Sequence, residues 1–165
     1  MNTIWIALGG NMGDVAATLH SARNSVEQLD HTHIIASSLL YRTPPLGPPG
    51  QPDYRNAVIA VASGLEPLAL LDALQHIETR HGRVRSEYWG ARTLDLDIIA
   101  IDNDIIDTKR LSVPHPHMHN RQFVLRPLCD IAPNWQHPRL GKTASALLDA
   151  LLLAGEPALE KGFKW

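Results

Sequence analysis

The sequence contains one cysteine, few aromatic residues and little net charge. Cys129 has no partner for an internal disulfide, and its apolar neighbours favour a structural thiol over a nucleophile. Aromatic residues make up 5% of the chain, and no predicted strand has the aromatic pattern of RNA-recognition modules. The net charge of -2 gives no general reason to expect a nucleic acid or an anionic membrane as partner.

Long apolar runs are also absent, which bears on the cellular setting. The opening segment, MNTIWIALGG, has no positive charge ahead of a long apolar stretch, so we expect no signal peptide. No apolar run is long enough to cross a bilayer. The chain has 165 residues, of which 44% are hydrophobic and 19% charged. We therefore expect one cytoplasmic domain over residues 1–165, with no membrane partner.

The most informative segment that is present covers residues 93–101, TLDLDIIAI. Leu94, Leu96 and Ile98 alternate with Asp95 and Asp97, which predicts a buried strand. Residues two apart on a strand share a face and lie about 7 Å apart. Two like charges on an apolar strand are costly unless a cation lies between them, and Mg²⁺ binds carboxylates together with substrate phosphates. The alternative, two solvated aspartates on an edge strand, fits the apolar neighbours less well.

Positive charge gathers on both sides of this strand. Eight of the fifteen Lys and Arg residues fall in the range 80–126, as expected if a polyanion is held against a metal pair. These residues are Arg80, Arg83, Arg85, Arg92, Lys109, Arg110, Arg121 and Arg126.

Hydrophobic periodicity predicts the order β-α-β-β-α-β, followed by further helices. Two loops interrupt it: a rigid loop over 43–52 with five prolines, typical of a binding loop, and a basic loop over 82–90. The order is that of the ferredoxin-like split βαβ fold, an α+β class with a mainly antiparallel sheet, helices packed on it, and extra C-terminal helices. Strands are predicted over 3–8, 33–41, 54–62 and 94–101, a short hairpin at 105–106, a loop over 109–120, and helices over 14–29, 66–81, 122–130 and 143–153.

Five sequence blocks occur in a fixed order along the chain: YRTPPLG (41–47), QPDYRN (51–56), GRVR (82–85), RTLDLD (92–97) and VPH (113–115). Together they resemble the 6-hydroxymethyl-7,8-dihydropterin pyrophosphokinase family of folate biosynthesis, over nearly the whole range 4–133. The resemblance implies an ATP-dependent enzyme that transfers the β,γ-pyrophosphoryl group of ATP to the pterin hydroxymethyl group and releases AMP. It implies two Mg²⁺ ions as cofactor and ATP as co-substrate, and we expect a monomer.

The same resemblance assigns roles to individual residues. Asp95 and Asp97 become the metal ligands, and Arg83 and Arg92 match catalytic and phosphate-binding arginines. The pterin pocket would contain two aromatic stacking faces and one side-chain amide, and it comprises Thr43, Pro44, Leu46, Tyr54, Asn56 and Phe123. The ATP site would comprise Gln75, Glu78, Arg85, Trp89, Arg92, Ile98, Arg110, Leu111, Ser112, His115 and Arg121.

Two positions depart from the family pattern, and two alternatives stay open. Pro116 and His119 stand where an aromatic and a basic residue are common, so nucleotide contacts from them are in doubt. The alternating imidazoles of His115, His117 and His119 could capture a transition metal, although an exposed loop that only titrates is the simpler interpretation. A protein that binds pterin or nucleotide without catalysis is the other alternative, but the Asp95, Asp97 and Arg92 that catalysis would need are all present.

Overall fold

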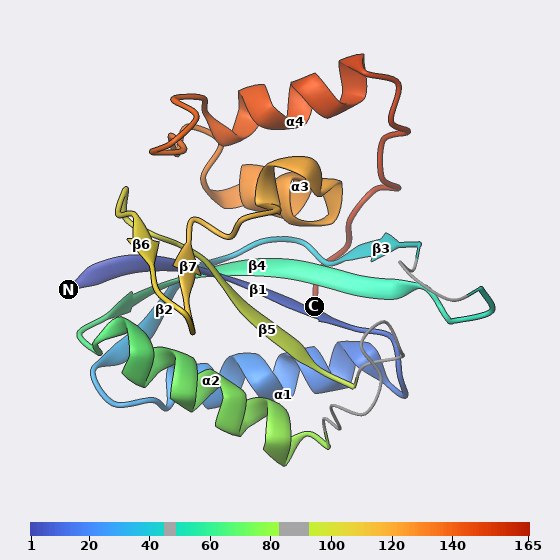
Figure 1. Ribbon diagram of the computed structural model, residues 1–165. Helices are drawn as coiled ribbons and strands as arrows, with labels where there is room; N and C mark the ends of the chain where they lie inside the picture. Colours follow the sequence, from blue (N-terminus) through green and yellow to red (C-terminus); the bar gives the residue numbers. More distant parts are fainter. Residues whose placement is uncertain (45–48, 83–92) are drawn as a thin grey trace.

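The structure, a computed structural model, describes residues 1–44, 49–82 and 93–165. Its centre is an antiparallel sheet in the order β2-β4-β1-β5, with β3 also paired to β4 (Figure 1). The apolar strand predicted from 54–62 is central, as expected, whereas the aspartate strand lies at the edge of this sheet. The bounds are β1 (Asn2–Gly10), β2 (Thr32–Ser37), β3 (Tyr41–Thr43), β4 (Tyr54–Ser63) and β5 (Asp95–Ile101).

Helices cover both faces of the sheet (Figure 1). The two helices of the βαββαβ order lie together on one face, and the two C-terminal helices lie on the other. The predicted ferredoxin-like core with additional C-terminal helices is therefore confirmed. The bounds are α1 (Val15–Glu27), α2 (Pro67–Arg80), α3 (Gln122–Ile131) and α4 (Ala144–Leu153).

Local sequence signals explain where these helices begin. The Asp14 side chain accepts a hydrogen bond from the Ala17 amide at 3.2 Å and caps α1. Pro67 occupies the first turn of α2, where its missing N–H costs nothing. Thr143 caps α4 in the same way as Asp14 caps α1, through its hydroxyl oxygen.

The sheet separates two apolar clusters. The α1/α2 cluster takes alternate residues of the sheet, among them Ile6 and Leu8 of β1 and Leu96 of β5, and packs them against the two helices. The α3/α4 cluster takes the opposite face, with Val58 and Ile99. Cys129 packs against this second cluster, and burial raises the pKa of its thiol to about 11, which agrees with a structural role.

The strand predicted over 33–41 is in fact two strands, because the backbone leaves β4 at Ser38. There the Ser38 hydroxyl, in place of a backbone carbonyl, accepts the Val58 amide at 2.9 Å. The next amide, of Leu39, donates to Asp130 of α3 at 3.2 Å. Leu40 then pairs with the backbone of Phe163. These partners lie far away in the sequence, so the break has no local signal.

The short hairpin also differs from its prediction. Its first strand, β6 (Ile106–Asp107), pairs with β7 (Ser112–Val113), which falls inside the predicted 109–120 loop. Ion pairs of Arg110 with Asp72 and of Arg139 with Asp107 fasten the hairpin to its surroundings. Within the described ranges, no helix has both the length and the apolar character that crossing a membrane requires.

Candidate functional site

Asp95 and Asp97 lie on the face of β5 that is turned toward α3. The intervening Leu96 and the following Ile98 belong to the α1/α2 cluster, so the two carboxylates point the other way. Both aspartates are half-buried. Their exposure is intermediate between that of the predicted buried strand and that of the alternative, two solvated aspartates on an edge strand. Two carboxylates on one face supply the oxygen ligands that Mg²⁺ prefers.

A row of paired residues runs across the sheet from Asp95. Asp95 pairs with Gly9 of β1, Gly9 with Asn56 of β4, and Asn56 with Tyr41 of β3. In the next row, Asp97 lies opposite Ala7. Paired residues of neighbouring antiparallel strands share a face, so the carboxylates and the Asn56 amide lie on the same side, with only small residues of β1 between them.

The Asn56 side chain is held in place from two directions. Its Nδ2 donates to Thr43 Oγ1 at 2.7 Å. A β-carbon at position 9 would lie 2.4 Å from Asn56 Oδ1, so only glycine leaves room for this amide. Gly9 was not among the predicted site residues, although a glycine inside a strand pattern is itself a signal of close approach.

The other described residues of the predicted pterin pocket come from β4, α3 and the segment after β3. Tyr54 lies two residues before Asn56 on β4, on the same face. Pro44 follows β3 and is exposed. Phe123 is on α3, half-buried against the α3/α4 cluster, with the Arg121 guanidinium 5.5 Å from its ring centre. Leu46 lies outside the described residues.

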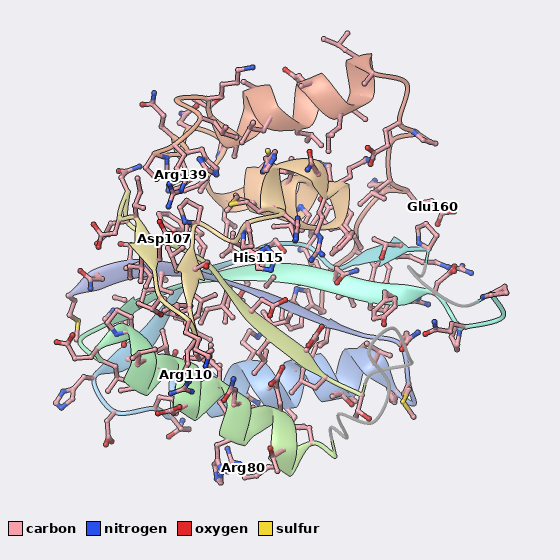
Figure 2. All side chains as sticks on the ribbon, in the orientation of Figure 1. Arg80, Asp107, Arg110, His115, Arg139 and Glu160 are labelled. Carbon is pink, nitrogen blue, oxygen red and sulfur yellow. The ribbon has the colours of Figure 1, made fainter. Side chains whose placement is uncertain are left out.

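His115 connects the loop before α3 to the aspartate strand. Its backbone amide donates to the Ile99 carbonyl at 2.9 Å, and its ring lies between the sheet and α3 (Figure 2). Burial, with the neighbouring Arg121 and His117, lowers the pKa of His115 to about 4, and Asp95 opposes this only in part. The imidazole is therefore neutral at pH 7, and the three predicted residues Asp95, His115 and Arg121 lie in one neighbourhood.

Glu78 of α2 is buried and bonded to the aspartate strand. Its Oε2 accepts the Leu96 amide at 2.8 Å, between the two predicted metal ligands, and 2% of the residue is exposed. The resemblance assigns Glu78 to the nucleotide. In the structure, the Glu78 carboxylate also accepts a hydrogen bond from the backbone of β5. Gln75, one helical turn earlier, is half-buried.

The hairpin brings further predicted nucleotide residues beside β5. Leu111 is buried and leads into β7, which begins at Ser112. Arg110 lies over α2, where it forms an ion pair with Asp72 (Figure 2). Ile98 is buried in β5, so only its backbone is free to contact a ligand. Sequence reasoning missed Asp72, since nothing local links it to position 110.

The basic loop carries the remaining predicted residues. Arg83, Arg85, Trp89 and Arg92 all lie outside the described residues, so their roles stay predictions from the sequence. Thr93, the first described residue after the loop, is near Met12, with 4.0 Å between the hydroxyl oxygen and the sulfur. The start of β5 therefore lies close to the turn that follows β1.

The three alternating histidines do not converge. His119 turns toward His137, with ring centres 6.2 Å apart, and its buried Nδ1 has no hydrogen-bond partner among the described residues. The rings of His115 and His117 are 6.0 Å apart. Over residues 1–44, 49–82 and 93–165, no three His, Cys, Asp or Glu side chains form a group that could hold a metal ion. The described residues therefore give the transition-metal alternative no support.

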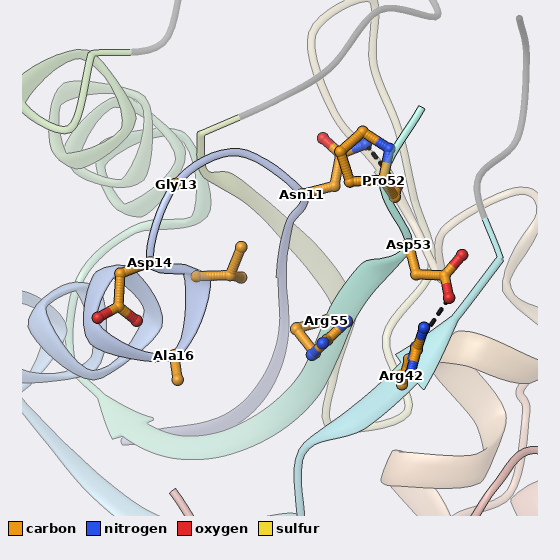
Figure 3. Close-up of a pocket in the computed structure, with 9 residues that line it drawn as sticks. Asn11, Gly13, Asp14, Ala16, Arg42, Pro52, Asp53 and Arg55 are labelled. Carbon is orange, nitrogen blue, oxygen red and sulfur yellow. Dashed lines mark hydrogen bonds and ion pairs between the residues drawn. The ribbon is translucent and has the colours of Figure 1, made fainter. Parts of the chain in front are cut away.

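A cavity of about 500 Å³ opens on the other side of the sheet, at the start of α1 (Figure 3). Arg42 and Arg55 face it because they alternate with Tyr41 and Asn56 on β3 and β4. Arg42 is paired with Asp53 at 2.8 Å. No predicted site residue lines this cavity, whose walls are Asn11, Gly13, Asp14, Val15, Ala16, Arg42, Pro52, Asp53 and Arg55.

Comparison with known proteins identifies close relatives by sequence. A protein of Haemophilus influenzae named 2-amino-4-hydroxy-6-hydroxymethyldihydropteridine pyrophosphokinase is 51% identical over 132 residues, 80% of this chain and 82% of the relative. A protein of the same name from Pseudomonas aeruginosa is 47% identical over 135 residues, 82% of this chain and 83% of the relative.

Solved structures share the fold at much lower identity. A crystal structure of HPPK-DHPS in complex with substrates gives a TM-score of 0.74 at 14% identity and covers 94% of this chain. A Plasmodium falciparum HPPK-DHPS triple mutant with STZ-DHP gives 0.76 at 14% identity over 98% of this chain. The chain spans 46% of the length of each of these solved chains. The model of the 7,8-dihydro-6-hydroxymethylpterin-pyrophosphokinase family matches residues 5–133, and together with the 51% identical relative it shows that the chain belongs to this family.

Proposed function

We propose that this pyrophosphokinase transfers the pyrophosphoryl group of ATP to 6-hydroxymethyl-7,8-dihydropterin, giving AMP and the pterin diphosphate in folate biosynthesis. Residues 1–165 would form one pyrophosphokinase domain that acts as a cytoplasmic monomer. The observation that carries the proposal is the row Asp95–Gly9–Asn56, in which a carboxylate and an amide share one face of the sheet. Such a row suits a phosphate chain and a pterin bound side by side.

Asp95 and Asp97 are the residues that would hold two Mg²⁺ ions. Their oxygens fit the donor set of this cation, and the residues opposite them on β1, Gly9 and Ala7, are small. When bound, the ions would neutralise phosphate charge and keep the reacting oxygens in line. His115, held neutral by burial, adds no positive charge that would compete with the metal for the two carboxylates.

The pterin would lie against Asn56. The hydrogen bond from Asn56 Nδ2 to Thr43 fixes the orientation of the amide, and its Oδ1 would accept an N–H of the pterin ring. Tyr54 and Phe123 would supply aromatic faces to the flat ring, and Pro44 and Leu46 would line its edge. This arrangement would direct the hydroxymethyl group toward the aspartate strand.

In the reaction, the pterin hydroxyl oxygen forms a bond to the β-phosphorus of ATP. The bond from the β-phosphorus to the oxygen bridging the α-phosphate breaks, AMP leaves with that electron pair, and the hydroxyl proton is released. Arg83 and Arg92 would donate hydrogen bonds to the transferring group, where charge shifts in the transition state. Arg85 and Trp89 would belong to the same loop and help exclude water.

The nucleotide would be held by residues from four elements. Arg121 would contact its phosphates, together with His115 and Arg110, and Gln75 and Glu78 would contact the nucleoside. Backbone groups of Ile98 and Leu111, beside Ser112, would hydrogen-bond the adenine. Supporting this arrangement, β7 and the 113–115 loop are joined to β5 through the His115 amide and the Ile99 carbonyl.

The test is product analysis with the purified protein, ATP, Mg²⁺ and 6-hydroxymethyl-7,8-dihydropterin. We expect AMP and the diphosphorylated pterin in equal amounts, and no product when EDTA is present. ADP as product would contradict the proposal, because it indicates transfer of a single phosphoryl group. Pterin binding without turnover would instead favour a binding protein.

A further inference from the structure

The chain after α4 crosses from one face of the sheet to the other. Residues 156–165, here called the terminal strap, run down past α3 to the sheet edge beside β3 (Figure 1). They lie beyond residues 5–133, the part that the family model matches. At its end, the Trp165 carbonyl accepts a hydrogen bond from Arg23 of α1 at 3.2 Å. Two further fastenings join the strap to α3 and to the segment before β3.

The first fastening is Gln122, the first residue of α3. Its Nε2 donates to the Pro157 carbonyl at 2.8 Å and to Glu156 Oε1 at 3.2 Å, and its Oε1 accepts the Leu159 amide at 2.9 Å. Only 4% of Gln122 is exposed. A buried amide with donors and acceptors satisfied in this way holds its partners firmly. Gln122 directly precedes Phe123, one proposed wall of the pterin pocket.

The second fastening is the break between β2 and β3. The Leu40 amide donates to the Phe163 carbonyl at 2.9 Å, and the Phe163 amide donates to the Leu40 carbonyl at 3.1 Å. Trp165 Nε1 donates to the Ser38 carbonyl at 2.7 Å. Directly before Phe163, Gly162 passes so close to Tyr41 that a β-carbon there would lie 2.8 Å from its ring. Tyr41 begins β3, which carries Thr43.

The strap acts together with a direct contact at the other end of α3. The Tyr41 hydroxyl donates to Asp130 Oδ2 at 2.7 Å, near the last turn of that helix. This contact and the burial of Val124, Leu125 and Leu128 in the α3/α4 cluster hold α3 on the sheet. The strap adds a link from Gln122, at the start of the helix, to the segment before β3.

We infer that the terminal strap positions the two walls of the pterin pocket, with Gln122 and Gly162 as its positioning residues. The inference rests on the proposed function, because it takes Phe123 and the Thr43–Asn56 pair as pterin contacts. The hydrogen bonds described above join the strap to α1, to α3 and to residues 38–40, and not to β5 or the β6–β7 hairpin, which carry proposed metal and nucleotide residues. Loosening it is therefore expected to weaken pterin binding and to leave nucleotide binding unchanged.

The test compares Gly162→Ala with Phe163→Ala in the full chain. Alanine at 162 forces the strap away from Tyr41 and Leu39, where its β-carbon would approach to 2.8 Å. Phe163 contributes its backbone to the pairing while its side chain is 48% exposed, so Phe163→Ala is the matched control. Kd values are measured by calorimetry for 6-hydroxymethyl-7,8-dihydropterin and, separately, for a non-hydrolysable ATP analogue with Mg²⁺.

We expect Gly162→Ala to raise the pterin Kd about tenfold, an effect of the size produced by one or two lost hydrogen bonds, with the nucleotide Kd unchanged. Phe163→Ala should match the unmodified chain in both. An equal rise of both Kd values would overturn the inference, because a structural role alone would not distinguish the ligands. So would an unchanged pterin Kd.

Gln122→Ala provides a second route if Gly162→Ala does not fold. It removes the hydrogen bonds between Gln122 and the strap without adding an atom, and the same selective rise of the pterin Kd is expected. Measurements on the unmodified chain distinguish failure of the proposed function from failure of the inference about the strap. If it binds no pterin and forms no AMP, the proposed function fails; if it does both and neither variant changes pterin affinity, only the inference about the strap fails.

Discussion

Gly9 and Asn56 lie opposite each other on β1 and β4, and a β-carbon on Gly9 would be 2.4 Å from Asn56 Oδ1. The side-chain amide of Asn56 on β4 therefore packs directly on the backbone of β1 at Gly9. The other side of that amide is fixed by Thr43. The proposed contact between Asn56 and the pterin thus depends on glycine, which has no side chain, at position 9.

The first prediction concerns this contact. Gly9→Ala should displace Asn56 from Thr43 and raise the KM for the pterin about tenfold, the cost of one well-placed polar contact. Steady-state kinetics at saturating ATP measure it. Gly64→Ala is the control, since its β-carbon would come no closer than 3.4 Å to His31. A Gly9→Ala enzyme with an unchanged pterin KM would refute this role for the amide.

The second prediction concerns the two aspartates. Asp97→Asn and Asp95→Asn keep size and shape but remove the charge that holds a cation, so kcat should fall at least about a hundredfold, as for other groups that stabilise transition-state charge. Thermal unfolding should shift little, because both side chains are only half-buried. Titration with Mg²⁺ supplies the check: activity that saturates at the same Mg²⁺ concentration as the unmodified enzyme would argue against these ligands.

The third prediction concerns Glu78. Glu78→Ala removes the acceptor of the Leu96 amide and should lower the free energy of unfolding by about 1–3 kcal/mol, the cost of a buried unpaired donor. Because Leu96 lies between Asp95 and Asp97, kcat should fall as well. Glu78→Gln retains an acceptor oxygen and should recover most of the stability. Urea unfolding monitored by tryptophan fluorescence compares the two variants, and equal destabilisation of both would show that the bond to Leu96 is not what matters.

The fourth prediction concerns pH. The pKa of His115 is lowered from 6.5 to about 4 in the folded state, so between these values the unfolded chain binds the extra proton. Stability due to this group is complete above pH 6.5 and is lost as the pH falls toward 4, by about 2 kcal/mol at pH 5. Arg121 and His117 favour the neutral ring, whereas Asp95 opposes it.

Unfolding curves at pH 7 and pH 5 measure this loss against a His115→Gln variant. The variant cannot titrate, so its stability should fall less over the same interval. Identical pH dependence in the two proteins would mean that His115 is not held neutral by its surroundings.

The elements that could be predicted from the sequence are those whose signals are local. Asp14 and Pro67 mark helix starts within one turn, and the alternation around Asp95 and Asp97 marks a strand and its two faces. The order of these elements then restricts the topology to few choices, which is why the ferredoxin-like arrangement was correct.

The features that could not be predicted depend on distant partners. The break at Ser38 is made by Asp130 and Phe163, which approach only after α3 and the terminal strap have packed. The same holds for the hairpin, whose second strand, β7, is defined by its pairing with β6. In the site, periodicity put both carboxylates on one face, but the Gly9–Asn56 contact follows from the register of β1 against β4, which periodicity does not give.

Along the strands of this sheet, residues that enter the core alternate with residues of the proposed site. On β5, Leu96 and Ile98 enter the α1/α2 cluster while Asp95 and Asp97 face the opposite way. A slip of β5 by a single residue would turn both carboxylates toward the apolar side chains of α1 and α2 and turn the leucine and isoleucine to the opposite face. The apolar packing that fixes the register of β5 therefore also fixes the positions of Asp95 and Asp97. A chain with the wrong register would lose its core and its site together, and would not persist as a folded but inactive enzyme.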